Sequence, residues 1–351
     1  MSELGRKTRE VKIGSVTVGG NHPIAIQSML NASPSDVEAN VRQTKALYQA
    51  GCEINRVAIQ GKQDIQLIPA IKQASPMPLV ADIQFNYRLA VEAAYAGADK
   101  VRINPGNIGS LDRVKEVVAA CRANGVPIRI GVNSGSLERE ILAKHGHPTA
   151  EALVESALYN IGQLEQCDFY DYIVAIKSSS VKTTMDAYRM ISRERDCPLH
   201  LGVTEAGTAH MGLVKSAAAL GSLLADGIGD TIRVSLTADP VDEVAAAQDI
   251  LRSVGLWKKG PTFVSCPTCG RCKVDLLAIA KAVEQALVSC QKPITIAIMG
   301  CVVNGPGEAR EADIGLAGGN PECILFRKGK EFARVPAEHA VEALLAEVER
   351  L

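Results

Sequence analysis

Short runs of alternating apolar and polar residues recur eight times in the first 240 residues, and helix-like segments separate them. Strands place successive side chains on opposite faces, whereas helices repeat an apolar face every three to four residues. Eight strands that alternate with helices predict an α/β fold, a (β/α)8 barrel of the TIM type. An open doubly wound sheet is the alternative, but no glycine-rich phosphate motif follows the first strand. The expected strands are 24–29, 53–60, 78–85, 100–106, 127–135, 171–179, 198–207 and 231–240, and the expected helices include 35–50, 88–96, 111–123, 149–166, 209–225 and 241–254.

The two ends of this repeating region predict further structure. Residues 11–20 have the pattern of a small hairpin that closes the floor of the barrel. After residue 255 the rhythm changes, which predicts a second, smaller α+β domain. We therefore expect a substrate-binding barrel at 1–255, a linker at 256–262 and a second domain at 262–351. The second domain is expected to contain strands at 263–267, 294–301 and 323–335, helices at 274–288 and 336–350, and a turn-rich stretch at 304–323.

The polar face of the predicted strands carries an unusual set of charges. The apolar face of each strand must meet the surrounding helices, so the polar face points into the barrel, where Val, Ile and Leu are normally found. One acid, Asp82, shares that inward phase on these strands. The basic residues in the inward phase are Arg56, Arg102, Arg129, Lys177 and Arg233.

Five buried cations with one acid predict a polyanionic ligand, because an unpaired buried charge costs several kcal/mol. A diphosphate held by bidentate arginines is the simplest such ligand. Asn133, Thr204 and Ser235 would add neutral donors. The alternatives are that single arginines pair with loop acids, that Asp82 is only a structural partner, and that His200 packs in the core.

Glu205 lies where the seventh strand ends, in the sequence Thr204-Glu205-Ala206-Gly207. Barrel enzymes place catalytic groups at this end of the strands. A carboxylate there predicts an acid/base group or a group that orients a substrate hydroxyl. The alternative role is to cap the helix that follows.

A cysteine and carboxylate set near the C-terminus indicates a metal centre. Cys266, Cys269 and Cys272 are spaced by three, and Cys301 and Glu308 follow in MGCVVNGPGE. Closely spaced thiolates with a distant one are typical of iron–sulfur and zinc sites. A zinc site usually adds a second short-spaced pair, which the sequence lacks. An iron–sulfur cluster is therefore the leading interpretation, with zinc or metal-free thiols as alternatives.

Composition and net charge restrict the possible binding partners and the cellular compartment of the protein. The formal net charge of −1 disfavours bulk attraction to nucleic acid or anionic lipid. The N-terminus lacks the apolar core of a signal peptide, and no stretch approaches the roughly 20 apolar residues of a membrane helix. Ten cysteines without an export signal predict a reducing compartment, so we expect a cytoplasmic protein.

When the predicted barrel and the predicted second domain are considered together, the chain resembles the family of 4-hydroxy-3-methylbut-2-en-1-yl diphosphate synthases of the non-mevalonate isoprenoid pathway. The resemblance covers essentially the whole chain. It rests on SCPTCGR (265–271), MGCVVNGPGEAREADIG (299–315), RINPG (102–106), RIGVNSGSL (129–137) and VTEAG (203–207).

The resemblance implies a TIM-type barrel joined to a small domain similar to the repeats of sulfite reductase. It implies an oxidoreductase that opens the ring of 2-C-methyl-D-erythritol 2,4-cyclodiphosphate with two electrons and loses water, giving the linear allylic diphosphate. A flavodoxin or ferredoxin would supply the electrons. The implied ligands of a 4Fe–4S cluster are Cys266, Cys269, Cys301 and Glu308.

Cys272 departs from the family pattern as a spare thiol beside the implied ligands, which leaves open a cluster with four cysteines and a free Glu308. The path of the chain favours a head-to-tail homodimer, which the resemblance also implies. Eleven residues from Gly255 to Cys266 span at most about 36–40 Å, so reaching the catalytic end of the same barrel needs an almost straight path. Two other functions stay open: a Schiff-base aldolase that uses Lys177, and a zinc-stabilised binding protein.

Overall fold

The structure, a computed structural model, describes residues 6–104, 108–302 and 309–351. The chain divides into two compact units, Met1–Leu256 and Trp257–Leu351. Each unit has its own secondary structure and core, so the two are described separately.

The first unit is built on eight parallel strands. They are β3 (Ala25–Ile26), β4 (Asn55–Ala58), β5 (Leu79–Asp82), β6 (Lys100–Ile103), β7 (Ile128–Asn133), β8 (Tyr172–Lys177), β9 (His200–Leu201) and β10 (Thr231–Ile232). Strands β4 to β8 pair in order, and β10 pairs with both β9 and β3. The bridges Gln27↔Ile54 and Val174↔Leu199 join the two sheets into a closed ring. The predicted (β/α)8 barrel is confirmed.

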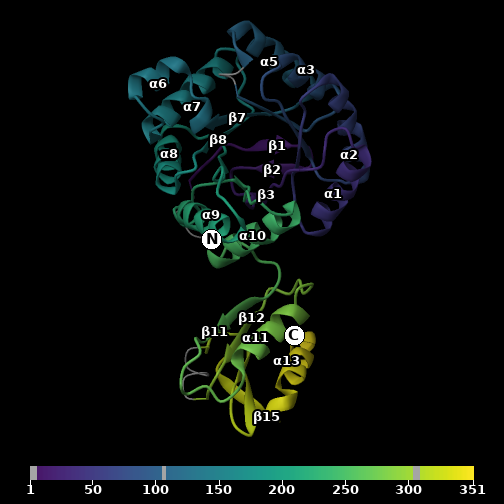
Figure 1. The fold of residues 1–351 in the computed structure, drawn as a ribbon, viewed down its shortest axis with the longest axis vertical. Helices are drawn as coiled ribbons and strands as arrows, with labels where there is room; N and C mark the ends of the chain where they lie inside the picture. The colour runs from purple at the N-terminus through teal and green to yellow at the C-terminus, as the bar shows by residue number, and fades with distance from the viewer. Residues whose placement is uncertain (1–5, 105–107, 303–308) are drawn as a thin grey trace. The chain divides into compact units, whose positions relative to one another are not determined.

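A ring of helices surrounds these strands, as Figure 1 shows from the end of the barrel. Helices α2, α6 and α8 add to the ones expected from the sequence. The helices are α1 (Val37–Gln49), α2 (Leu67–Ala74), α3 (Tyr87–Tyr95), α5 (Leu111–Asn124), α6 (Arg139–His145), α7 (Ala150–Glu165), α8 (Val181–Glu194), α9 (Ala209–Ala225) and α10 (Pro240–Ser253).

The start of α10 is fixed by its sequence. Asp239 is the N-cap and accepts a hydrogen bond from the Val241 amide at 2.9 Å, and Pro240 occupies the first turn, where its missing N–H has no cost. This cap sets which side chains of the first turn face the barrel.

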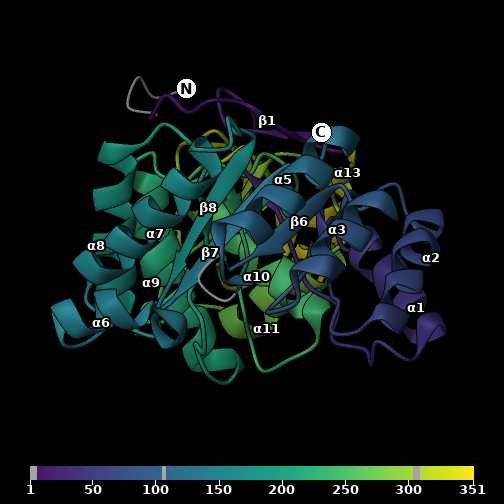
Figure 2. The same ribbon diagram turned by 90° about the horizontal axis from the view of Figure 1, so that it is seen from above.

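A hairpin covers the amino end of the barrel. Its strands β1 (Val11–Ile13) and β2 (Val16–Val18) are antiparallel, and Figure 2 shows β1 across one end of the barrel strands. The hairpin side chains pack against the first inward residues of four barrel strands, and together they form an apolar floor. This floor consists of Val11, Ile13, Val18, Ala25, Ile54, Val80 and Ile173, all at most 2% exposed.

In the residues that the structure describes, the second unit contains a mixed sheet of five strands and two α-helices. Its strands, in spatial order, are β11 (Thr262–Ser265), β12 (Thr295–Met299), β13 (Ile314–Ala317), β14 (Glu322–Arg327) and β15 (Lys330–Pro336). Strands β11, β12 and β13 are parallel, and β14 and β15 are antiparallel to their neighbours. Helices α11 (Leu276–Ala286) and α13 (Ala340–Arg350) pack against the apolar core of the unit.

One expectation for this unit was wrong in part. The stretch 304–323 was expected to consist of turns, but its residues Ile314–Ala317 form the central strand β13. All four are buried between β12 and β14. The flanking glycines gave the segment its turn-like composition.

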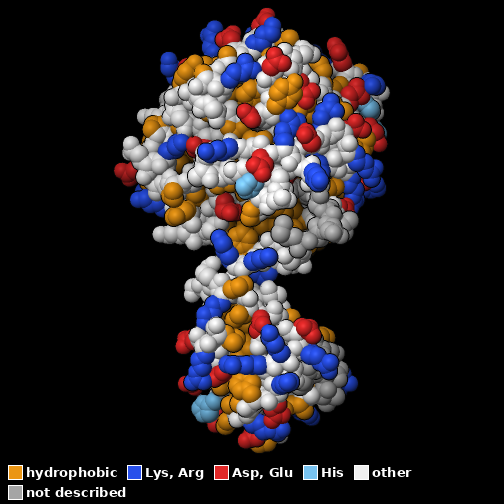
Figure 3. All heavy atoms as spheres, turned by 180° about the vertical axis from the view of Figure 1, so that it is seen from behind, with side chains coloured by type: hydrophobic (Ala, Val, Ile, Leu, Met, Phe, Trp, Pro, Cys, Tyr) orange, Lys and Arg blue, Asp and Glu red, His pale blue; other side chains and the backbone are white. Residues whose placement is uncertain are grey.

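The surface agrees with the near-zero net charge. Acidic and basic side chains are interspersed on the face of each unit drawn in Figure 3. Among the residues that the structure describes, none belongs to a helix with the length and apolar character needed to cross a membrane.

Candidate functional site

The barrel interior contains a small polar cavity of about 210 Å³. All five basic residues predicted to point inward line it, and they come from strands β4, β6, β7 and β8 and from the residue after β10. The lining residues are Arg56, Gln84, Arg102, Arg129, Gly131, Asn133, Ala175, Lys177, Thr204, Arg233 and Ser235. The cavity therefore has the cationic wall that a polyanion requires.

Asp82 connects two of these arginines. Its Oδ2 accepts from Arg56 Nη2 at 2.6 Å, and its Oδ1 accepts from Arg102 Nη1 at 3.1 Å. Burial alone would raise the pKa of this carboxyl, but the charges of Arg56 and Arg102 outweigh it and lower the pKa to about 2. Asp82 is thus a permanent anion that fixes the two guanidinium groups.

A second acid, Glu243, was missed by the strand pattern. It lies in the first turn of α10, is 4% exposed, and accepts from Arg233 Nη2 at 3.3 Å. It also accepts from Ser28 Oγ at 3.2 Å and from the Leu236 amide at 3.1 Å. The expectation of a single acid in the enclosure was therefore wrong, because a helix supplies another one.

Two glycines in the strands make room for long cations. A Cβ at Gly131 would lie 2.5 Å from Arg102 Nε, and one at Gly202 would lie 2.8 Å from Lys177 Nζ. No other residue type leaves that space, so these glycines determine where the charges of Arg102 and Lys177 lie.

Lys177 has an unusual electrostatic environment. Burial, followed by the charges of Arg233 and Arg129, holds the pKa of its amine well below the usual value. An anion bound in the cavity would offset the charges of Arg233 and Arg129 and raise the pKa of Lys177 again. The protonated form of Lys177 is therefore favoured by the ligand that the cavity predicts.

The neutral donors lie at the carboxyl end of the strands. Asn133 ends β7. Both the oxygen and the nitrogen of its side-chain amide have a hydrogen-bond partner when the oxygen accepts from Arg102 Nη2 at 3.1 Å. Thr204 and Ser235 line the same cavity from the segments after β9 and β10. His200, one step deeper, bonds through Nδ1 to Thr231 Oγ1 at 2.7 Å, as a packed histidine does.

Glu205 is exposed next to the cavity residue Thr204 and has a φ of +52°. The left-handed conformation costs a residue with a side chain about 1–2 kcal/mol. The helix that follows, α9, has Thr208 as its N-cap. The Glu205 backbone is therefore held in a strained conformation at the mouth of the barrel, and the capping role has no support in the structure.

The cysteines lie at one edge of the second unit. Cys266 directly follows β11 and Cys301 closely follows β12, and these strands are parallel neighbours. The Gly300 amide donates to Cys266 Sγ at 3.2 Å, which brings that sulfur next to the residue before Cys301. Cys269 is exposed on the turn between Cys266 and Cys272.

Cys272 faces the protein rather than the solvent. Its Sγ donates to the Val274 carbonyl at 3.1 Å, and it packs against the core of the unit. A Cβ at Gly300 would lie 2.6 Å from this sulfur. Cys272 thus makes contacts typical of a structural thiol.

Glu308 lies outside the described residues. In the part of the chain that the structure covers, no three His, Cys, Asp or Glu residues are arranged to hold a metal ion. The donors nevertheless fit an iron–sulfur cluster, because a backbone N–H that points at a cysteine sulfur stabilises a thiolate ligand.

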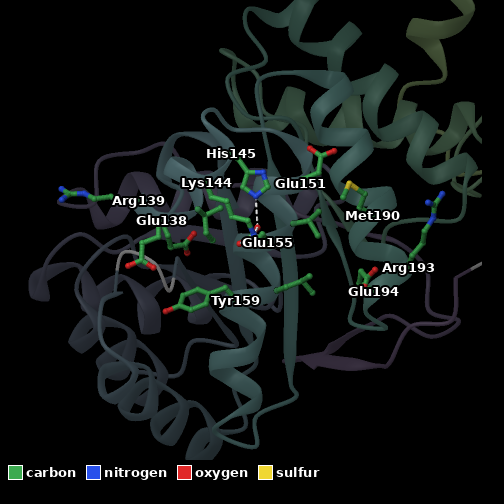
Figure 4. Close-up of a pocket in the computed structure, with 14 residues that line it drawn as sticks. Glu138, Arg139, Lys144, His145, Glu151, Glu155, Tyr159, Met190, Arg193 and Glu194 are labelled. Carbon is green, nitrogen blue, oxygen red and sulfur yellow. Dashed lines mark hydrogen bonds and ion pairs between the residues drawn. The ribbon is translucent and has the colours of Figure 1, made fainter.

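A larger cavity of about 1290 Å³ lies outside the barrel ring, between α6, α7 and α8. Figure 4 shows that its polar groups contact one another: Glu155 accepts from Lys144 and His145, each at 2.8 Å. Several glutamates also line it, among them Glu138 and Glu151. Its charged lining includes both acids and bases, so it does not have the unbalanced cationic wall of the barrel cavity.

Comparison with known proteins adds independent findings. The GcpE TIM-barrel domain matches residues 8–248, and the GcpE protein C-terminal domain matches residues 262–350. A protein of Caldanaerobacter subterraneus subsp. tengcongensis is 52% identical over all of this chain and 99% of its own length. One of Clostridium perfringens is 53% identical over 99% of each chain. Both are named 4-hydroxy-3-methylbut-2-en-1-yl diphosphate synthase (flavodoxin).

Solved structures share the barrel at low sequence identity. The 3-dehydroquinate dehydratase of Geobacillus kaustophilus has a TM-score of 0.51 and 16% identity, covering 71% of this chain and 98% of its own. A truncated 3-deoxy-D-arabino-heptulosonate 7-phosphate synthase of Thermotoga maritima has a TM-score of 0.50 and 14% identity, covering 73% and 96%. At this identity the likeness concerns the fold alone.

Proposed function

The chain belongs to the GcpE family, and we propose that its barrel binds the substrate while its second unit holds a redox centre. Its reaction is the conversion of 2-C-methyl-D-erythritol 2,4-cyclodiphosphate to 4-hydroxy-3-methylbut-2-enyl diphosphate, since relatives that share half of its residues over their full length are named for it. The reaction consumes two electrons and two protons and releases one water. The observation that carries the proposal is the cationic cavity inside the barrel.

The barrel residues bind and orient the diphosphate. Asp82 and Glu243 neutralise part of the charge of the five basic residues, and the remaining positive charge matches a cyclic diphosphate. The arginines give paired, planar donors and Lys177 gives a point charge, so the phosphates are fixed in direction as well as in place. Asn133, Thr204 and Ser235 bind the remaining oxygens. These cations also stabilise the phosphate oxygen that ring opening releases.

Glu205 acts at the mouth of the cavity. Its carboxylate orients the substrate hydroxyl, takes a proton from solvent, and as a general acid passes that proton to the hydroxyl as it leaves as water. The strained backbone of this residue supports the assignment, because such conformations concentrate at functional sites.

The redox centre is a 4Fe–4S cluster held by Cys266, Cys269, Cys301 and Glu308. When bound, a cluster supplies single electrons at low potential, which no side chain can do. Flavodoxin, which appears in the names of the relatives, is the proposed electron donor, with ferredoxin as the alternative. Two features of the protein would influence how the Cys266 sulfur binds iron: the N–H of Gly300, which donates to it, and the apolar neighbours of Cys266.

Metal analysis and turnover test this proposal together. Protein purified without oxygen should contain about four irons and four sulfides per chain, with no zinc, and should convert the cyclic diphosphate when reduced flavodoxin is present. A colourless, zinc-containing protein without turnover would instead favour a zinc-stabilised binding protein. Borohydride trapping of a substrate carbonyl on Lys177 would favour the aldolase.

We further propose that the active site is shared between two chains in a head-to-tail homodimer. Helix α10 runs back along the barrel to its amino end, and Cys266 follows Gly255 after eleven residues, at most about 36–40 Å. The catalytic groups lie at the opposite end of the strands. A cluster unit that serves the barrel of its partner removes the need for a fully extended path.

Mixing two inactive variants tests the shared site. We expect a mixture of the Arg129→Glu and Cys301→Ser proteins to regain activity after subunit exchange. In each heterodimer, one of the two active sites then combines an intact barrel with an intact cluster unit. Activity is measured against each variant alone, and exchange is followed with a tag on one of them. If exchange is complete and the mixture stays inactive, the site is built within one chain.

A further inference from the structure

Lys100 is a buried base that the proposed catalytic groups do not include. It opens β6, one inward step before Arg102, and its side chain is fully buried. Among the residues that the structure describes, no group accepts a hydrogen bond from its Nζ. The sequence pattern missed it because the alternation on this strand was read only from Val101 onward.

The surroundings of Lys100 are cationic. Its electrostatic neighbours are Arg129 on β7 and Arg56 on β4. Both oxygens of Asp82, from the adjacent β5, are engaged by Arg56 and Arg102. Lys177, His200 and Tyr188 are further titratable groups here, and each is linked electrostatically to Arg129. Below it is the apolar floor, where Val80 is the strand partner of Lys100.

An ammonium in this place would be unpaired and surrounded by like charge, which costs several kcal/mol. Burial, followed by the charges of Arg129 and Arg56, holds the pKa of Lys100 well below the usual value. A neutral amine has a lone pair as well as two hydrogens. It can therefore accept as well as donate, and the barrel contains buried donors without a partner in the described chain, Arg129 Nε and Gln27 Nε2.

We propose that Lys100 is a ligand-linked proton acceptor: its amine is neutral in the empty barrel and takes one proton from solvent when an anionic diphosphate occupies the cavity. The inference rests on the proposed binding of the diphosphate to the barrel cations. The ligand offsets the charges of Arg129 and Arg56, which line the cavity and which, after burial, lower the pKa of Lys100. The balanced step is R–NH2 plus H⁺ giving R–NH3⁺.

This proton uptake suits the chemistry of ring opening. The substrate has two ionisable phosphate oxygens, and the reaction turns an ester oxygen into a further ionisable one. The bound ligand thus becomes more negative as the reaction proceeds. A protonated Lys100 adds positive charge behind Arg129, which lines the cavity, and so offsets the added negative charge of the ligand. Lys100 is a positioning residue in this scheme, since it does not line the cavity.

The linkage has a definite sign. Ligand binding raises the pKa of Lys100, so binding is favoured by protons between the pKa of the empty barrel and that of the complex. In this range the dissociation constant rises about tenfold per pH unit for each proton taken up. Below the lower pKa the contribution of Lys100 to the slope vanishes.

Calorimetry with the cyclic diphosphate substrate measures this uptake. The substrate is titrated into oxidised holoenzyme without reductant, in Tris and in HEPES, and the difference in heat gives the protons exchanged. We expect Lys100→Met to bind the substrate but to take up about one proton fewer than the wild type. The slope of log Kd against pH should fall by the same amount. Lys115→Met, which removes an exposed lysine of α5, is the matched control and should leave both values unchanged.

The outcomes separate this inference from the proposed function. An unchanged proton count in a folded Lys100→Met protein overturns the role of Lys100 while the diphosphate site stands. Unchanged binding in Arg129→Glu removes the site itself. If Lys100→Met does not fold, wild-type protein labelled at the lysine Cε carbons replaces it. The Lys177→Met variant identifies the resonance of Lys177. The resonance of the other buried lysine, Lys100, should then shift on ligand binding at constant pH, and an unshifted resonance refutes the proposal.

Discussion

Replacing Arg129 with glutamate should weaken binding of the cyclic diphosphate by about 100-fold or more and leave the absorption of the cluster unchanged. Arg129 is 1% exposed and lines the cavity, so the change removes a buried cation and adds a repelling anion. Loss of one partner from a buried charge pair costs about 2–5 kcal/mol, and each 1.4 kcal/mol is tenfold. The dissociation constant measured by calorimetry and the visible spectrum report the two effects separately.

Two further changes in the same wall sharpen this test. Arg233→Glu should have a similar effect, and it also leaves the buried carboxylate of Glu243 without its cationic partner. Lys177→Arg should impair turnover, because a planar fork replaces a point charge in the space that Gly202 provides. The matched control is Arg139→Glu, the same charge change on exposed α6. Wild-type affinity in both glutamate variants of the barrel would mean that the substrate binds elsewhere.

Serine at Cys266, Cys269 or Cys301 should remove most or all of the iron, whereas Cys272→Ser should keep it. The first three follow the ends of β11 and β12 or lie in the loop after β11, whereas the Cys272 sulfur donates to the Val274 carbonyl. A serine hydroxyl is a much poorer ligand for cluster iron than a thiolate. Iron and sulfide analysis of anaerobic protein, with the absorption spectrum, measures the result.

The role of Glu308 is tested in the same series. Glu308→Gln should change the spectrum, because the carboxylate is the proposed fourth ligand. The ligand set is wrong if Cys272→Ser loses the cluster while Glu308→Gln keeps an unaltered spectrum. A carboxylate is also a more exchangeable ligand than a thiolate, so the wild-type cluster should degrade readily in air.

The barrel could be predicted from the sequence because the signal on each strand is local. Alternation of apolar and polar residues determines which side chains face inward, and this placed Arg56, Arg102 and Arg129 in one enclosure. Glu243 could not be found in this way, since it reaches Arg233 from a helix and depends on how α10 packs on the strands. Its signal was an acid in the first turn on the buried face of that helix.

Other features needed tertiary information. Strand β13 is short and glycine-flanked, and its buried position comes from the strands on both sides of it. The inward direction of Lys100 follows from alternation, but its lack of an acceptor does not, because that depends on Asp82 being engaged by two arginines. The contact of Cys272 with the Val274 carbonyl is likewise a feature that spacing does not reveal.

The apolar floor formed by the hairpin and the barrel strands has a kinetic consequence. It covers the amino end of the barrel, so we expect ligands to enter the cavity from the carboxyl ends of the strands. Substrate and product must then use the same passage in turn, and a bound product excludes the next substrate. The linear diphosphate retains both phosphates, and with them most of its attraction to the arginines. We therefore expect an accumulating product to compete with the substrate for the cavity and to raise its apparent KM.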